Sequence, residues 1–133
     1  MRHVADNPVI HLELHTGNLG RACAFYTRLF RWRAETIHSG SGSYLTLDPG
    51  DRVGGGVVEC DTSHPVWLPY VEVADVRETI DQARLLGASV ALEPREGPAG
   101  WRSVLDVPAG GEIAVWQPKT MTRPITRNRR RSA

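Results

Sequence analysis

The sequence predicts an α+β fold made of two similar halves, and the main sign of this is a duplication. Residues 11–48 and 68–106 align as one segment present twice, with an offset of 57 residues. In each copy, a run that alternates apolar and polar residues precedes a run with helical spacing. The chain has 133 residues, of which 41% are hydrophobic, so it can bury one sizeable core. One half of the chain alone would lack the apolar area needed to offset the conformational entropy lost on folding. We therefore expect the halves to pair, with any functional site between them.

The first half is predicted to contain a strand, a helix and three further strands. Residues 9–15 alternate strictly, so one face of this strand is apolar and the other is polar. Asn18 is expected to cap an amphipathic helix whose apolar face packs on the sheet. That face carries Ala22, Phe25, Tyr26, Leu29 and Phe30. The next strands are expected at 33–38, at 43–48 and up to residue 60, with turns at 40–42 and 49–51 and a turn or bulge at the glycines 54–56.

The second half, after a linker at 61–65, repeats this order. A strand is expected at 67–73, and Asp75 is expected to cap a helix that runs through Ala83, Leu85 and Leu86 and ends at Gly87. Further strands are expected at 90–93, 101–106 and 112–117, the last two joined by a turn at 107–111. Residues 94–100 contain two prolines and two glycines, which predicts a loop and a candidate mobile lid over a ligand.

Composition and charge exclude several classes of protein. No apolar run approaches the roughly 20 residues that span a bilayer, and the first residues lack the apolar region of a secretion signal. Two scattered cysteines favour reduced thiols and a cytoplasmic location. Residues 119–133 carry six basic side chains and no apolar period, which predicts a disordered tail. All 15 acidic residues precede this tail, and a body this acidic would repel nucleic acid.

Short motifs in both halves resemble those of one superfamily. The first half has His11-Leu12-Glu13-Leu14, followed by Ala24-Phe25-Tyr26 and Leu29-Phe30-Arg31-Trp32, and the second has residues 70–76, 85–88 and 108–110. Together they resemble the vicinal oxygen chelate superfamily, which includes glyoxalase I, bleomycin-binding proteins and extradiol dioxygenases. The resemblance covers about residues 8–118 and implies a single glyoxalase-like domain. In it, two βαβββ modules, 8–60 and 66–118, would form a curved mixed sheet with a concave cavity, in a homodimer.

The resemblance also implies where a metal ion would bind. The four positions, at the first and last strand of each module, correspond to His11, Glu59, Leu68 and Ala114. Because Leu68 and Ala114 carry no donor atom and a divalent ion needs about three or four ligands, we expect no cofactor. A divalent metal ion at His11 and Glu59 is the alternative. A displaced cluster, formed by Glu13, His15, Tyr70 and Glu72, also stays open.

Aromatic and basic side chains near the predicted cavity indicate a pocket for a ligand. The candidate ligand-binding residues are Tyr44, Tyr70, Arg95, Trp101, Arg102 and Trp116. Such a set suits a hydrophobic or aromatic small molecule, in part anionic, although a core role is an alternative for each tryptophan. Strand parity places Trp116 on the cavity side, with Ala114, and turns Trp67 toward the helices.

Two classes of function fit these residues. One is a metal-free protein that binds or sequesters a small molecule, as the bleomycin-binding members do. The other is an enzyme similar to other members of the superfamily, a lyase, isomerase or dioxygenase-like protein. Its candidate catalytic residues, acting as general acid and base with or without a divalent metal, are His11, Glu13 and Glu59.

Overall fold

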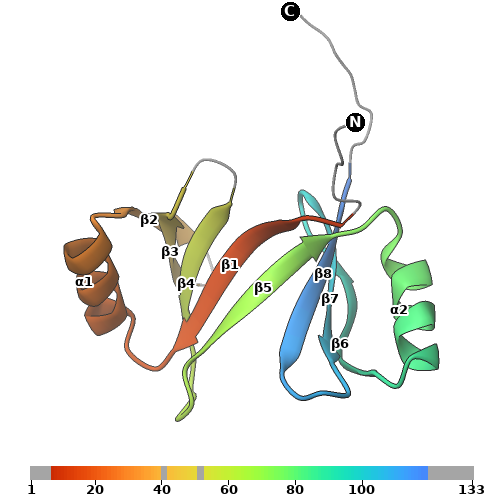
Figure 1. The fold of residues 1–133 in the computed structure, drawn as a ribbon. Coiled ribbons are helices and arrows are strands. Elements are labelled where there is room, and N and C mark those ends of the chain that lie inside the picture. Colours follow the sequence, from red (N-terminus) through yellow and green to blue (C-terminus); the bar gives the residue numbers. More distant parts are fainter. Residues whose placement is uncertain (1–6, 40–41, 51–52, 120–133) are drawn as a thin grey trace, which may run out of the picture. The chain divides into compact units, whose positions relative to one another are not determined.

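The computed structural model describes residues 7–39, 42–50 and 53–119, and it confirms the α+β prediction (Figure 1). The predicted turns at 40–42 and 49–51 lie partly outside these residues, and all of the predicted disordered tail except Lys119 lies outside them. The first half contains β1 (Val9–Thr16), α1 (Leu19–Phe30), β2 (Arg33–Ser39), β3 (Gly42–Asp48) and β4 (Gly54–Glu59). The second half contains β5 (Val66–Glu72), α2 (Val76–Leu85), β6 (Ser89–Glu96), β7 (Gly100–Asp106) and β8 (Glu112–Pro118). Each half therefore has the predicted order βαβββ.

The eight strands follow the order β2-β3-β4-β1-β5-β8-β7-β6 in a mixed sheet. Strands β1 and β4 are parallel, whereas β2 with β3, β3 with β4, β6 with β7 and β7 with β8 are antiparallel. The chain divides into two compact units, which we call the first unit (residues 8–70) and the second unit (residues 71–119, with Asn7). Strand β5 passes from the first unit into the second.

In the first unit, α1 covers the apolar face of the sheet with one row of side chains. Asn18 caps the helix as predicted, because its side chain accepts a hydrogen bond from the backbone N–H of Arg21. The core consists of Leu14, Leu45, Leu47 and Val57, and the helical residues packed on it are Leu19, Ala22, Cys23 and Tyr26. Trp67 also packs here, and its indole N–H donates to the Tyr26 hydroxyl at 3.2 Å, so it faces the helix as predicted.

The prediction that the whole apolar stripe of α1 packs on the sheet is wrong. Phe25, Leu29 and Phe30 remain 50–57% exposed. A helix of 12 residues presents one narrow row to a sheet, and the row through Ala22 and Tyr26 occupies it. Phe30 instead stacks on the rings of Tyr26 and Trp32 at the edge of the unit.

In the second unit, α2 packs through its first two turns. Asp75 caps it as predicted and accepts hydrogen bonds from the backbone N–H groups of Arg77 and Glu78. The core consists of Val73, Val76, Ile80, Leu105 and Val115. Gly87 follows the helix with a φ of 99°, the conformation that favours glycine at this position.

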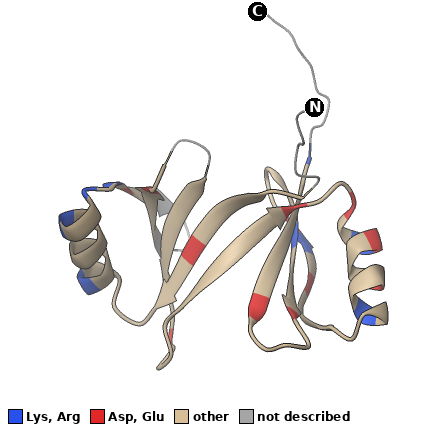
Figure 2. Cartoon of the chain, viewed as in Figure 1, with Lys and Arg blue, Asp and Glu red and all other residues tan. Residues whose placement is uncertain are grey.

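Leu85 and Leu86 do not join the core of the second unit. Their exposed fractions are 87% and 78%. Leu85 comes five residues after Ile80 and therefore points to the other side of the helix, while Leu86 is already the C-cap. Figure 2 shows that α2 carries both basic and acidic residues.

The predicted lid at 94–100 is not a long loop, because most of it is strand. Strand β6 continues to Glu96, and Arg95 and Glu96 pair with Arg102 and Trp101 on β7. The turn between them is short and is closed by a 2.7 Å hydrogen bond from Gly97 N–H to the carbonyl oxygen of Gly100. Pro94 falls where the register shifts between Leu92 and Arg95, a position that does not need an N–H donor.

The two glycines of this hairpin are expected to differ in their tolerance of a side chain. A Cβ at Gly100 would overlap the backbone carbonyl oxygen of Gln117 and lie 2.8 Å from the Trp116 ring, whereas at Gly97 the nearest atom would be 3.7 Å away. Neither glycine has a positive φ. We expect Gly100→Ala to lower the free energy of unfolding by about 1–2 kcal/mol and Gly97→Ala to change it little, as measured by urea titration. Equal losses in the two variants would contradict this account of the hairpin.

Neither of the helices in the described part of the chain is long and apolar enough to cross a membrane.

Candidate functional site

The glycines at 54–56 are part of β4, so the predicted turn or bulge is wrong. They pair in regular register with His11, Leu12 and Glu13 of β1. A Cβ at Gly56 would overlap the hydroxyl of Tyr44, and one at Gly54 would lie 2.9 Å from Nδ1 of His11. Glycine is therefore needed here because two polar side chains lie directly over the backbone of this strand.

Five side chains over this strand form what we call the polar cluster of the first unit. They are His11, Glu13 and His15 of β1, Tyr44 of β3 and Tyr70 of β5. The three β1 residues share a face because side chains on a strand alternate with a period of two. Glu13 is 8% exposed, whereas the side chains of His11 and His15 are 26% and 31% exposed. A carboxylate at the centre is thus covered by groups that reach the surface.

The Glu13 carboxylate accepts hydrogen bonds on both oxygens. The Tyr70 hydroxyl donates to Oε1 at 2.9 Å, and Nε2 of His15 lies 2.8 Å from the same oxygen. The Tyr44 hydroxyl lies 3.4 Å from Oε2 and 3.2 Å from Nε2 of His11, which is itself 3.9 Å from Oε2. Because a carboxylate can only accept, the proton in the His15 bond is carried by Nε2, and Nδ1 of the neutral ring keeps the lone pair.

Glu13 and Tyr70 are also equivalent residues in the duplicated sequence. They are separated by 57 residues, which is the offset that aligns the two halves. The duplication has therefore placed a carboxylate on one copy and a hydroxyl donor on the other, and the two meet in a buried hydrogen bond.

The cluster keeps Glu13 ionised. Burial raises the pKa of this carboxyl, but hydrogen bonds from the histidines and from Tyr70, together with charge on His15, outweigh burial and lower the pKa from 4.5 to about 2. His11, at 3.9 Å, is too far for a full hydrogen bond, so we assign most of the lowering to His15 and Tyr70. Glu13 is therefore a poor proton acceptor at neutral pH and a good partner for a positive ring.

The four positions expected for a metal ion do not provide a set of ligands. Leu68 and Ala114 are buried apolar residues with 3% and 0% exposure. Glu59 aligns with Thr16 on β1, five residues along from His11, and its carboxylate accepts a hydrogen bond from the N–H of Leu19 at the start of α1. In the described ranges, no three His, Cys, Asp or Glu side chains come together in a group that could hold a metal ion.

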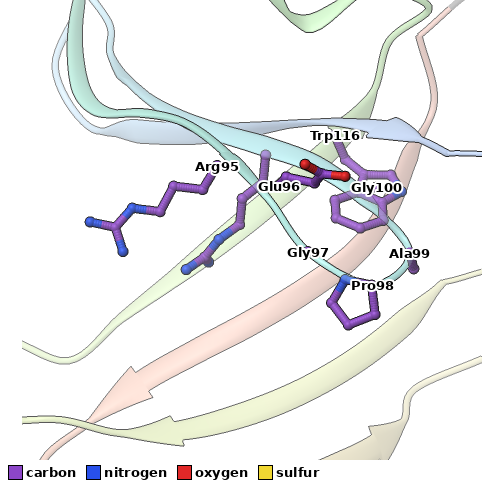
Figure 3. A pocket seen from close by; sticks show the side chains of 8 residues that line it. Arg95, Glu96, Gly97, Pro98, Ala99, Gly100 and Trp116 are labelled. Carbon is purple, nitrogen blue, oxygen red and sulfur yellow. The ribbon is translucent and has the colours of Figure 1, made fainter.

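The second unit holds a pocket lined by three of the predicted ligand-binding residues, Arg95, Arg102 and Trp116. Its volume is about 390 Å³, and the turn between β6 and β7 forms its rim (Figure 3). Trp101 does not line this pocket. Its ring packs against the core of the unit, with the Lys119 ammonium group 5.7 Å from the ring centroid.

From the sequence, His15 is expected only as part of a possible displaced metal site. Its strict i, i+4 spacing from His11 with Glu13 between them is the pattern that could have identified it. Tyr44 and Tyr70 were expected to contact a ligand. In the structure, the hydroxyl groups of both lie against the Glu13 carboxylate.

Comparison with solved structures places this architecture among known proteins. A hypothetical protein from Bacillus halodurans C-125 matches with a TM-score of 0.68 and 13% identity over 90% of this chain and 99% of its own. Methylmalonyl-CoA epimerase from Mycobacterium tuberculosis matches with a TM-score of 0.63 and 15% identity over 85% and 89%. A methylmalonyl-CoA epimerase in complex with methylmalonyl-CoA and NH4+ has a TM-score of 0.63 and 16% identity over 86% and 96%. The chain shares their fold.

This fold, with the order βαβββ in each half, agrees with the fold implied by the resemblance of the sequence motifs to the vicinal oxygen chelate superfamily. No protein-family model matches the sequence, and no curated protein sequence matches it either. At 13–16% identity, the likeness concerns the fold, and the function has to be argued from the residues of this chain.

Proposed function

We propose that this chain is an enzyme that moves a proton on a small carbonyl compound, with His15 as the acid–base group. The observation that carries this proposal is the 2.8 Å contact between His15 Nε2 and the buried, ionised Glu13. A carboxylate in this position fixes the tautomer of an imidazole and stabilises the ring when it gains a proton. Glu13 is then a positioning residue and not the base itself.

The step that this dyad supports is a reversible proton transfer. Nδ1 of His15 takes a proton from the carbon next to a carbonyl group, the electron pair of the C–H bond passes into an enolate, and the imidazolium returns the proton to carbon. The His15 side chain is 31% exposed, which gives a substrate access to the imidazole ring. The hydroxyl groups of Tyr44 and Tyr70 donate to the Glu13 carboxylate and hold it in place.

The solved neighbours support an enzyme over a passive binding protein. Two of the three neighbours are named methylmalonyl-CoA epimerases, and one of these two structures contains methylmalonyl-CoA. A thioester with an acidic hydrogen beside its carbonyl is therefore the first substrate class to test. Glu59, a candidate catalytic residue from the sequence, has no part in this step, because its carboxylate accepts a hydrogen bond from the N–H of Leu19 at the start of α1.

The test is the exchange of substrate protons for deuterium. Purified protein is incubated in heavy water with methylmalonyl-CoA and with a panel of acyl thioesters and 2-oxo acids, and the deuterium content is read by mass spectrometry. We expect exchange in at least one substrate and a loss of about 10²–10⁴-fold in His15→Gln. The matched control is His64→Gln, because His64 lies exposed in the segment before β5 of the same unit.

A binding protein without catalysis is the second candidate, and one observation favours it. Glu13 is already satisfied by its neighbours, as in a polar cluster that only supports a fold. Stoichiometric binding of a thioester, with no exchange above the rate of His15→Gln, would favour this candidate. Exchange that is unchanged in His15→Gln would show that the dyad is not the site.

A further inference from the structure

The pocket of the second unit contains two arginines that face each other across a strand pair. Arg95 on β6 and Arg102 on β7 are direct partners in the antiparallel register. Both residues line the pocket, so two guanidinium groups lie at one ligand-sized cavity.

The nearby carboxylates are engaged elsewhere. Glu96, next to Arg95, lies 2.7 Å from the Lys119 ammonium group, and Glu93 lies 3.6 Å from Arg84 of α2. Within the described residues, Arg95 takes part in no ion pair with a carboxylate. The Arg95 guanidinium is therefore available to an anion in the pocket.

The other end of the pocket is apolar and flat. The indole of Trp116 lies across the ladder from Arg102, and Gly100 next to it leaves the face of the hairpin without a side chain. Figure 3 shows Arg95 extending at one end of the pocket, while Trp116, Gly100 and Pro98 lie toward the other. A volume of about 390 Å³ falls within the range of small-molecule sites.

We infer that this pocket binds a flat organic anion, with its carboxylate or phosphate bound by Arg95 and its apolar part against Trp116. Guanidinium groups bind both kinds of anion through paired, charge-assisted hydrogen bonds. An indole face offers stacking and apolar burial to a planar group. This inference does not depend on proton transfer at His15, since every residue that it uses belongs to the second unit.

The probes for the test are 2-naphthoate, 2-naphthyl phosphate and neutral 2-naphthamide, titrated into the full chain by isothermal calorimetry. We expect at least one anion to bind and the amide to bind about tenfold or more weakly, with affinity falling as salt is added. Tighter binding of the carboxylate or of the phosphate identifies which anion the site prefers. Failure of both anions to bind at millimolar concentration, or equal binding of the amide, would overturn the inference.

Variants locate the binding and separate it from folding. Arg95→Gln is expected to weaken the better anion by about tenfold or more, while Arg77→Gln, an exposed change on α2 of the same unit, leaves its affinity unchanged. Because Arg95 is exposed and makes no ion pair with any described residue, the melting temperature of Arg95→Gln without ligand should be close to that of the parent protein. An unchanged affinity in Arg95→Gln, or an equal loss in Arg77→Gln, would place the anion elsewhere.

Discussion

Glu13→Gln is expected to lower the free energy of unfolding at neutral pH by on the order of 3 kcal/mol, and to remove part of its pH dependence. The pKa of Glu13 is about 2 in the folded chain against an ordinary value of 4.5. A lowered pKa stabilises the folded state at a pH above the ordinary value, and this stabilisation is lost as the pH falls from about 4.5 to about 2. Urea titrations from pH 7 to pH 2 measure the difference between the parent protein and the variant.

The control for this experiment is Glu35→Gln, which changes an exposed carboxylate on β2 of the same unit. Its difference from the parent protein should be small at every pH. The difference for Glu13→Gln should be large at pH 7 and shrink toward pH 2, where the parent protein also loses the charge. A difference in the free energy of unfolding that stays constant across this pH range would mean that Glu13 contributes through packing alone and that the cluster does not stabilise its ionised form.

The order of elements could be predicted because each half follows rules that act over a few residues. Asn18 and Asp75 cap helices through hydrogen bonds to backbone groups two or three residues away, so the local sequence identifies them. Likewise, the alternation of apolar and polar residues along β1 shows which residues belong to each face of the strand. The offset of 57 residues then shows that the same pattern occurs twice.

The errors concern features that depend on contacts between distant residues. Phe25 and Leu29 have helical spacing, but only packing against the sheet decides which row of a helix is covered, and neither belongs to that row. Residues 94–96 read as loop because of Pro94, whereas their pairing with β7 holds them in a strand. Local turn signals were overruled by tertiary pairing in both this hairpin and the glycines of β4.

The candidate site was predictable in composition but not in arrangement. His11 and Glu13 could be placed on one face of a strand from their spacing alone. That Tyr44 and Tyr70 would donate to Glu13 could not be inferred, because it requires the register of β3 and the position of β5 beside β1. Glu59 was assigned to the site by a family position, and the register of β4 with β1 places it five residues from the partner of His11.

Gly56→Ala is the change expected to disrupt this arrangement with the fewest added atoms. The new Cβ would overlap the Tyr44 hydroxyl and lie 2.5 Å from Cζ of that ring, so the ring must turn away from His11 and Glu13. We expect the free energy of unfolding to fall by about 2–3 kcal/mol, from overpacking and from lost hydrogen bonds, although alanine by itself restricts the unfolded chain and favours folding. Urea titration measures the loss, and the ring resonances of His11 should shift in NMR spectra.

Two further variants separate this clash from a general effect of alanine in a strand or turn. Gly50→Ala adds the same methyl group where no atom lies within 4 Å, so it should leave both stability and the His11 resonances nearly unchanged. Tyr44→Ala removes the ring that Gly56→Ala displaces, so the two changes together should cost less than the sum of their separate costs, by about 1 kcal/mol or more. Additive costs would mean that Tyr44 does not lie over Gly56, and the contact between Tyr44 and His11, on which the geometry of the polar cluster rests, would have to be abandoned.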